Sequence, residues 1–156
     1  DDMSIPGMRF VTSDRLLAFG DQKVLIYEGK QKPAVAKEIK CKKNIRSIYY
    51  NKEYFGLVFD DPDAAGGYLT NVYSMKGRLM LEQKFTLGYT DIDLLQNGLL
   101  CIRNDKSVQL YTMRGNKRFE YTFDRSIYDV ISGKGQLDYW FIMNGETDRI
   151  KLKDEY

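Results

Sequence analysis

The sequence predicts an all-β fold, a β-propeller-like array of about four blades, three complete and one incomplete. The first reason is a repeat: Tyr73-Ser74-Met75-Lys76-Gly77 returns almost unchanged as Tyr111-Thr112-Met113-Arg114-Gly115. A spacing of about 40 residues is typical of propeller blades, each a small sheet that buries its faces against its neighbours. The second reason is that no window keeps apolar residues at helical spacing without a glycine or a β-branched run. The repeat also disfavours a β-sandwich, the alternative fold, because sandwich strands are not equivalent to one another.

One strand of every blade leads into the repeated turn. Its residues are largely aromatic or β-branched, which favours extended structure. Copies are expected at 24–27, 68–73, 108–111 and, in degenerate form, 148–152. The first three are each closed by a glycine, which can take the positive φ that a tight hairpin turn requires.

The other strands follow from the apolar runs on either side of this one. Two runs precede it in each copy, at 8–11 and 15–19, 45–50 and 54–59, 92–95 and 99–102, and 128–131 and 137–143. A run after the turn adds a fourth strand at 33–41, 79–85 and 117–123, whereas the last copy ends without one. Hairpin residues such as Asn51-Lys52 and Asn97-Gly98 join the runs.

These strands place the blades at about 8–44, 45–88, 89–126 and 127–156, after a tail or incoming strand at 1–7. Four blades are the low end for closure. The chain is therefore expected to be a small closed propeller, half of a larger one, or an open arc that completes itself in a dimer. In an open arc the end blades would expose apolar faces, and we expect a homodimer through them. The residues expected to line these exposed faces are Phe10, Leu17, Ile26, Trp140 and Ile150.

Composition fits a globular domain and excludes several kinds of chemistry. The chain has 156 residues, 43% of them hydrophobic, and a formal charge of +2. It has no histidine, which removes the Ser-His-Asp and Cys-His arrangements and the commonest neutral-pH base. Cys41 and Cys101 are expected to be small buried thiols rather than a disulfide or zinc ligands. We therefore predict no catalytic residue and no cofactor, and expect that the protein is not an enzyme.

Carboxylates are the remaining candidates for site chemistry. Asp60, Asp61 and Asp63 form a weak calcium candidate, because an Asp-x-Asp start suits a calcium loop but Ala65 stands where the next oxygen ligand belongs. A solvated hairpin loop is the favoured interpretation. Asp91 and Asp93 alternate on a predicted strand. Together with the first three they could serve a glycan-binding or glycan-processing propeller, if two carboxyls lie about 5 to 10 Å apart across a cleft.

Two further features suggest an interaction surface. The stretch 30–46 holds seven basic residues against the single acid Glu38, and Lys37, Lys40, Lys42 and Lys43 are its candidates for contact with an anionic surface. The favoured interpretation is that these lysines protect an exposed edge strand from aggregation. No aromatic residues interleave with them as base stacking would require, so nucleic acid is not expected. Trp140 is the other candidate, although its apolar strand favours a core position.

The Tyr-Ser/Thr-Met-Lys/Arg-Gly turns, Arg118-Phe119, the 127–131 strand and Ile150-Lys151-Leu152-Lys153 carry a family resemblance. Over residues 5–153 the chain resembles the C-terminal half of an uncharacterised family of Gram-positive bacterial proteins, a domain of unknown function with a WD-repeat-like or quinoprotein-like propeller. The resemblance implies a single N-terminal membrane-spanning segment and about twice this much β-sheet. It also implies a place on the extracytoplasmic face of a bacterial membrane, and it carries over no catalytic residue.

The expected function is therefore a non-enzymatic propeller module that binds a protein or a surface ligand at the bacterial cell envelope. The alternatives are the glycan propeller and a purely structural half-scaffold whose partner is its own missing half. The chain opens on Asp1-Asp2 rather than methionine, so we expect a fragment of a longer protein. It has no apolar run long enough to span a bilayer, so membrane contact is expected only through a segment outside this chain.

Overall fold

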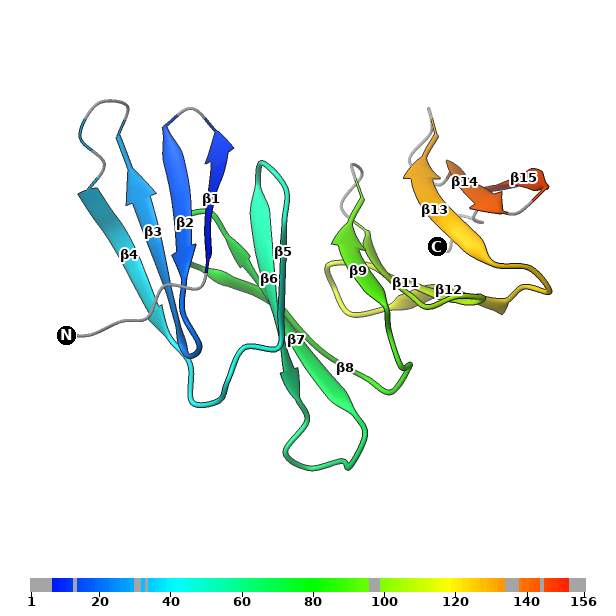
Figure 1. Cartoon of the computed structure of the whole chain (residues 1–156), viewed down its shortest axis with the longest axis horizontal. Helices are drawn as coiled ribbons and strands as arrows, with labels where there is room; N and C mark the ends of the chain where they lie inside the picture. The colour runs from blue at the N-terminus through cyan, green and yellow to red at the C-terminus, as the bar shows by residue number, and fades with distance from the viewer. Residues whose placement is uncertain are drawn as a thin grey trace. The chain divides into compact units, whose positions relative to one another are not determined.

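The computed structural model describes residues 7–12, 14–29, 32, 34–95, 99–133, 138–143 and 145–151. Their regular structure consists of fifteen strands in four antiparallel sheets (Figure 1). The chain divides into two compact units, unit 1 at residues 1–86 and unit 2 at residues 87–156. The prediction of an all-β protein is confirmed.

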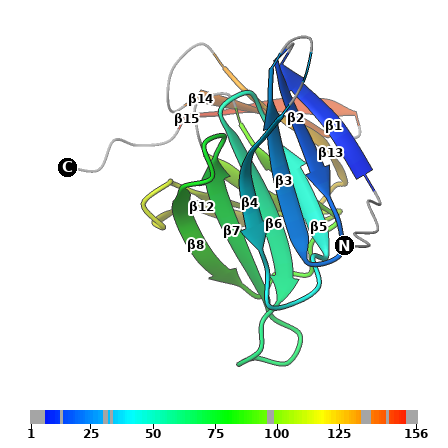
Figure 2. The same ribbon diagram turned by 90° about the vertical axis from the view of Figure 1, so that its left-hand side faces the viewer.

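Unit 1 contains sheets A and B, whose strands follow one another in chain order (Figure 2). Each strand pairs with the next through a short connection, which is the simplest antiparallel arrangement. Sheet A consists of β1 (Gly7–Thr12), β2 (Arg15–Phe19), β3 (Lys23–Glu28) and β4 (Ala34–Lys40). Sheet B consists of β5 (Ser47–Tyr50), β6 (Tyr54–Asp60), β7 (Tyr68–Ser74) and β8 (Leu79–Phe85).

Unit 2 contains sheets C and D. Sheet C consists of β9 (Asp91–Leu94), β10 (Leu100–Arg103), β11 (Ser107–Tyr111) and β12 (Lys117–Thr122). Sheet D consists of β13 (Ile127–Ser132), β14 (Asp138–Met143) and β15 (Glu146–Lys151). Among the residues with described placement, sheet D has three strands where the other sheets have four. The four sheets correspond to the four predicted blades. The exact residue limits of the blades stay a prediction.

The core of unit 1 lies between its two sheets. Leu17 and Ile26 of sheet A pack in one cluster with Phe55 and Leu57 of sheet B, and Met75 of the β7–β8 turn joins them. The exposed fractions are 1% for Leu17 and 0% for Ile26. The expectation that these two residues line an exposed end face is therefore wrong, because the neighbouring sheet covers them. The side chains of Phe10 and Ile150 lie outside the described part, and the homodimer stays a prediction.

The core of unit 2 is built in the same way from sheets C and D. Val108 and Leu110 of β11 share a buried cluster with Tyr139 and Phe141 of β14. Phe141 also meets the ring of Phe123, with centroids 5.3 Å apart. Aromatic and β-branched side chains therefore fill the space between the sheets, as expected for blades that bury their faces against each other.

The repeated pentapeptide folds into the same turn in both units. Ser74 N donates to Arg78 O at 2.8 Å, and Thr112 N donates to Asn116 O at 2.9 Å. Gly77 and Gly115 each adopt a φ of 85°. Glycine takes this left-handed conformation without the steric cost that a Cβ brings. The repeat in the sequence therefore records a hairpin whose backbone requires glycine.

A close approach between two strands also requires a glycine in sheet B. Tyr49 of β5 is paired with Gly56 of β6, and a Cβ built on Gly56 would lie 1.9 Å from Tyr49 Cζ. The Tyr49 hydroxyl hydrogen-bonds Thr70 Oγ1 at 2.6 Å, and Thr70 Oγ1 donates to Leu57 O at 3.0 Å. The ring thus covers the bare backbone of Gly56 while its buried hydroxyl is satisfied.

Candidate functional site

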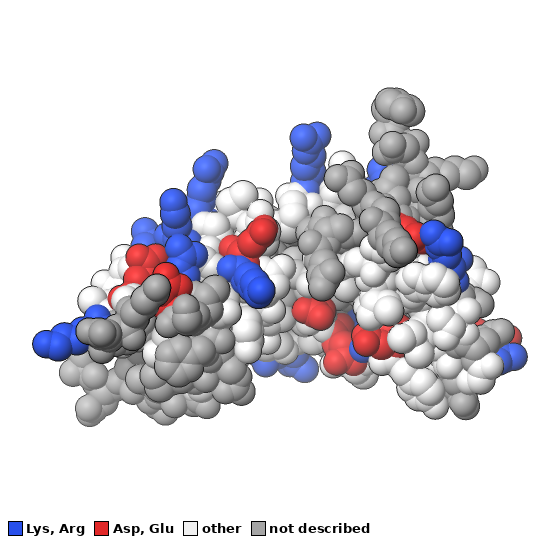
Figure 3. All heavy atoms as spheres, turned by 90° about the horizontal axis from the view of Figure 1, so that it is seen from above, with Lys and Arg blue, Asp and Glu red and all other residues white. Residues whose placement is uncertain are grey.

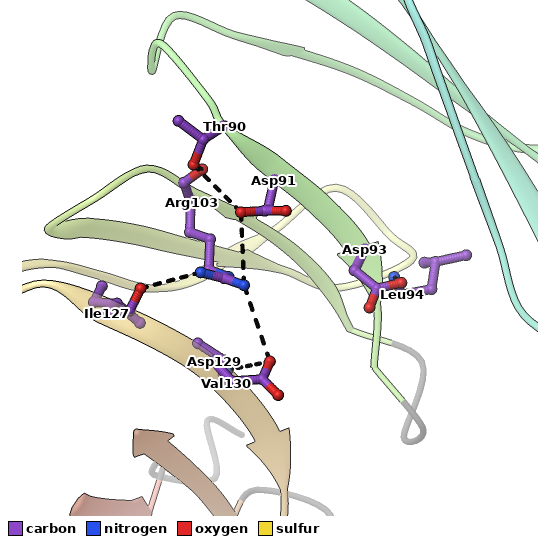
Figure 4. Close-up of polar contacts among 8 residues, drawn as sticks. All are labelled: Thr90, Asp91, Asp93, Leu94, Arg103, Ile127, Asp129 and Val130. Carbon is purple, nitrogen blue, oxygen red and sulfur yellow. Dashed lines mark hydrogen bonds and ion pairs between the residues drawn. The ribbon is translucent and has the colours of Figure 1, made fainter. Parts of the chain in front are cut away.

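The candidate site is a small cavity between sheets C and D of unit 2, which we call the Arg103 cavity. Its volume is about 110 Å³. Asp91 and Asp93 of β9, Arg103 of β10 and Asp129 of β13 supply its charged lining. Ile92, Leu95, Cys101 and Val130 supply the rest. Figure 4 shows Arg103 between Asp91 and Asp129, with Asp93 further along β9.

Arg103 connects the two sheets. Its Nη1 donates to Ile127 O of β13 at 3.3 Å, and its Nη2 lies 3.6 Å from Asp91 Oδ2 and 4.0 Å from Asp129 Oδ1 (Figure 4). The side chain of Arg103 is 16% exposed, whereas those of Asp91 and Asp129 are 59% and 58% exposed. The guanidinium therefore lies inside, and the two carboxylates face water at the opening.

Asp93 is the carboxylate that Arg103 does not hold. Its Oδ1 accepts a hydrogen bond from Leu94 N at 2.8 Å, and none of the ion pairs in the described part of the chain involves it. Partial desolvation, the largest cause, raises the pKa of Asp93, and the charges of Asp129 and Asp91 add to the rise, while the hydrogen bond from Leu94 N and the charge of Arg103 oppose it. A carboxylate whose charge is poorly compensated favours the approach of a cation.

The cavity holds three carboxylates against one guanidinium. The neighbouring thiol does not change this balance, because burial raises the pKa of Cys101 to about 12 and keeps it protonated at neutral pH. Ligand pockets usually measure about 300 to 1,000 Å³, so this cavity admits one functional group rather than a whole ligand. The arrangement suits a single ammonium or guanidinium group, whose N–H donors match the carboxylate oxygens.

The Asp93 carboxyl is expected to lower the stability of the native state at neutral pH. Because its pKa is raised in the native state, the native state binds the proton more tightly than the unfolded chain, and stability falls as the pH rises through the raised pKa. Asp93→Asn keeps the acceptor for Leu94 N and removes the charge. We expect it to raise the melting temperature at pH 7 and to leave it nearly unchanged at pH 3, as followed by circular dichroism. A lower melting temperature at pH 7 would contradict the assignment.

The calcium candidate is held together by cations of the protein. Lys84 Nζ lies 3.3 Å from Asp63 Oδ2 and 3.7 Å from Asp61 Oδ1, and Arg46 Nη1 lies 3.1 Å from Asp60 Oδ1. Asp61 Oδ1 also accepts a hydrogen bond from Asp63 N at 2.9 Å, which fixes the turn. Across the ranges with described side chains, no three His, Cys, Asp or Glu residues gather as metal ligands. The Asp61 side chain is only 5% exposed, whereas those of Asp60 and Asp63 are 72% and 77% exposed, and the interpretation as a solvated loop stays a prediction.

The lysine candidates lie where an edge strand was expected. Lys37 and Lys40 belong to β4, the outer strand of sheet A, while Lys42 and Lys43 follow it, and all four are exposed. Glu38 lies among them and forms an ion pair with Lys23 at 3.0 Å. On the face drawn in Figure 3, acidic side chains lie next to basic ones. This placement agrees with protection of an edge strand.

Trp140 takes part in a contact that the sequence did not indicate. It is half-buried on β14, with the guanidinium carbon of Arg149 5.6 Å from the centroid of its ring. Arg149 Nε and Nη2 donate to Asp138 Oδ1 and Oδ2 at 2.8 and 2.6 Å, and the Asp138 side chain is only 5% exposed. Trp140 thus lies against the arginine of a bidentate ion pair.

Arg103 and Asp129 are the site residues that sequence reasoning missed. The alternation of Asp91 and Asp93 marked one wall of the cavity, but the other wall comes from the next sheet. A bridging arginine with acids on two different blades leaves no local pattern. β9 and β13 belong to different sheets, so their residues could be predicted to line one cavity only if the packing of sheet C against sheet D was already known.

Four sequential antiparallel sheets, packed in pairs within each unit, define a protein of the β-propeller class, and solved structures agree. The chain is similar to BBS1N from its complex with ARL6DN (TM-score 0.57, 16% identity, covering 96% of this chain and 53% of that one). It is also similar to Kluyveromyces lactis Hsv2 (TM-score 0.59, 8% identity, 99% and 51%) and to a eukaryotic initiation factor (TM-score 0.64, 10% identity, 97% and 42%). The predicted β-propeller-like fold is confirmed, and the chain spans about half the length of these structures.

Residues 1–152 match a family of unknown function, DUF5711, and the chain belongs to that family. The expected membership of an unknown-function family is thereby confirmed. No curated protein matches the chain. Among the residues whose structure is described, none forms a helix with the length and hydropathy needed to cross a membrane.

Proposed function

We propose that this chain is a non-enzymatic binding module that captures the cationic end of a lysine or arginine side chain of a protein partner. The Arg103 cavity, with three carboxylates for one internal guanidinium, is the observation that carries the proposal. Ile92 and Val130 in the lining offer apolar surface to the methylene groups of such a side chain. A volume of about 110 Å³ suits a side-chain end better than a free ligand.

The glycan alternative has one observation in its favour. Asp91 Oδ2 and Asp129 Oδ1 both contact Arg103 Nη2, at 3.6 and 4.0 Å, so they lie no farther apart than the sum of these distances. That limit falls below the upper end of the separation of about 5 to 10 Å found between the two carboxyls of glycosidases. The small cavity leaves no room for a sugar ring between them, and both carboxylates are engaged with Arg103. We therefore prefer binding to glycan processing.

The proposal also covers the rest of the protein and its location in the cell. The chain spans about half of the propellers it resembles, which supports a second half as one of its partners. We place the parent protein on the outer face of a bacterial membrane, and this rests on the resemblance described above. A purely structural half-scaffold would need the second half alone and would have no use for the uncompensated carboxylates of the Arg103 cavity.

The test is binding of a fluorescein-labelled oligolysine at low salt, followed by anisotropy. Asp91→Asn/Asp93→Asn should weaken binding about tenfold, because two of the three carboxylates lose their charge. Asp105→Asn/Asp124→Asn is the matched control, since both are exposed acids of unit 2 outside the cavity and the charge change is the same. Equal losses in both variants would indicate steering by net charge alone and would contradict the proposal. Unchanged binding in both would favour the half-scaffold.

A further inference from the structure

A groove in unit 1 has a different chemistry from the Arg103 cavity. It lies where the β5–β6 and β7–β8 turns of sheet B meet the start of β2, and its volume is about 480 Å³. This volume falls within the range of about 300 to 1,000 Å³ that is usual for ligand pockets. We call it the Met80 groove, after the exposed methionine in its lining.

Hydrogen bonds between the two turns fix the shape of the groove. Met75 N donates to Glu53 O at 3.1 Å, which ties one turn to the other. Asn51 Oδ1 accepts from Glu53 N and Tyr54 N, both at 2.8 Å, and holds the β5–β6 turn. Met75 is 2% exposed and packs in the core of unit 1, so its side chain fixes the β7–β8 turn to that core. The groove is therefore formed before anything binds, which lowers the entropic cost of binding.

The rim of the groove is basic. Arg15, Lys52, Lys76 and Arg78 contribute four cations, against the single acid Glu53. Glu28 lies 3.6 Å from Arg15 and compensates one of them. In the part of the chain that the structure describes, no ion pair engages Lys52, Lys76 or Arg78. Three uncompensated cations around one groove favour an anionic occupant.

The interior of the groove is apolar. Met80 is 40% exposed although it is a large hydrophobic residue, and the half-buried Tyr54 also lines the groove. Methionine adapts its shape to different partners and is frequent on surfaces that bind peptides. An anionic polymer such as polyphosphate has no group that would use this apolar surface. A peptide that combines carboxylates with an apolar side chain uses both the rim and the interior.

We propose that the Met80 groove binds an acidic peptide segment of a partner protein, with an apolar side chain against Met80 and flanking carboxylates at Lys52, Lys76 and Arg78. The proposal is independent of the Arg103 cavity, since it concerns the other unit and the opposite charge. It assigns unit 1 a recognition function of its own.

The experiment uses a fluorescein-labelled peptide of repeated Glu-Glu-Leu and measures its anisotropy with the whole chain. Lys76→Glu/Arg78→Glu should weaken binding by more than about tenfold, and Met80→Gln by about fivefold, because the first removes charge complementarity and the second apolar contact. The matched control is Lys106→Glu/Arg114→Glu, which makes the same charge change in unit 2, with Arg114 at the equivalent position of the repeated turn. The control should bind as the wild type does.

Three outcomes would overturn the proposal. Equal weakening in the control would show attraction by net charge. A Met80→Gln variant that binds the peptide normally would show that the groove interior takes no part. Polyphosphate binding as tightly as the peptide, with loss in Lys76→Glu/Arg78→Glu and none in Met80→Gln, would assign the rim to an anionic polymer instead. Circular dichroism spectra of each variant check that the fold is retained, and Lys52→Glu gives an independent second test of the rim.

Discussion

Arg149→Met is expected to destabilise the native state, because it removes the bidentate partner of a buried carboxylate. The change removes the two hydrogen bonds that Arg149 donates to the Asp138 carboxylate, whose side chain is 5% exposed. The loss is moderated because the Arg149 side chain is 58% exposed and water can partly replace it. Urea unfolding followed by tryptophan fluorescence would measure the loss, since Trp140 lies against Arg149.

The matched variant is Arg149→Met/Asp138→Leu. Replacing both partners of a buried ion pair by apolar residues is often close to neutral, so the double variant should regain most of the lost stability. A double variant that is no more stable than Arg149→Met would contradict the view that the lost pairing of Asp138 with Arg149 causes the loss. It would point instead to packing of the Arg149 methylenes on Trp140.

Arg103→Met is expected to destabilise unit 2 by about 2 kcal/mol at pH 7, because a hydrogen bond from a charged group and the ion pairs with Asp91 and Asp129 are lost together. The bond joins Arg103 Nη1 to Ile127 O across the two sheets. The loss should shrink at pH 3, where most carboxyls are protonated and no longer repel one another. Thermal unfolding at both pH values would measure it.

A second substitution separates the two contributions of Arg103. Arg103→Met/Asp129→Asn should recover part of the loss at pH 7 and none at pH 3, because only the repulsion has been relieved. A loss that is the same at both pH values and is not relieved in the double variant would mean that Arg103 acts only through its contact with Ile127 O.

Local patterns were sufficient to predict the strands. The repeated turn and the apolar runs reproduced the limits of β2 (Arg15–Phe19) and β8 (Leu79–Phe85), because the side-chain period and the turn residues are properties of neighbouring residues. β5 begins at Ser47 rather than Ile45, since Ile45 N donates to Asp21 O at 2.7 Å in a connection between sheets. That hydrogen bond depends on packing and has no local signature.

Packing between sheets also explains why the burial of Leu17 and the partners of the charged residues could not be predicted from the sequence. Leu17 was assigned to an exposed face. The alternation of side chains along a strand shows that the strand has two faces, but it does not show which of these faces the next sheet covers. Arg103 and Asp129 belong to different sheets, and Asp138 meets Arg149 across β14 and β15. Charged residues show no periodicity that would connect such partners, so the candidate site became visible only with the fold.

The close approach of Tyr49 to Gly56 bears on how the sequences of this family can diverge. A relative with any side chain at position 56 must have moved or replaced the ring at position 49, because a Cβ there would lie 1.9 Å from Tyr49 Cζ. The hydroxyl of Thr70 would then lose its hydrogen-bond partner at 2.6 Å, so a substitution at position 56 also affects position 70. We expect these three positions to be inherited as a set. Distant members of the family, too dissimilar for overall alignment, should be recognisable by whether they carry the whole set or have replaced all of it.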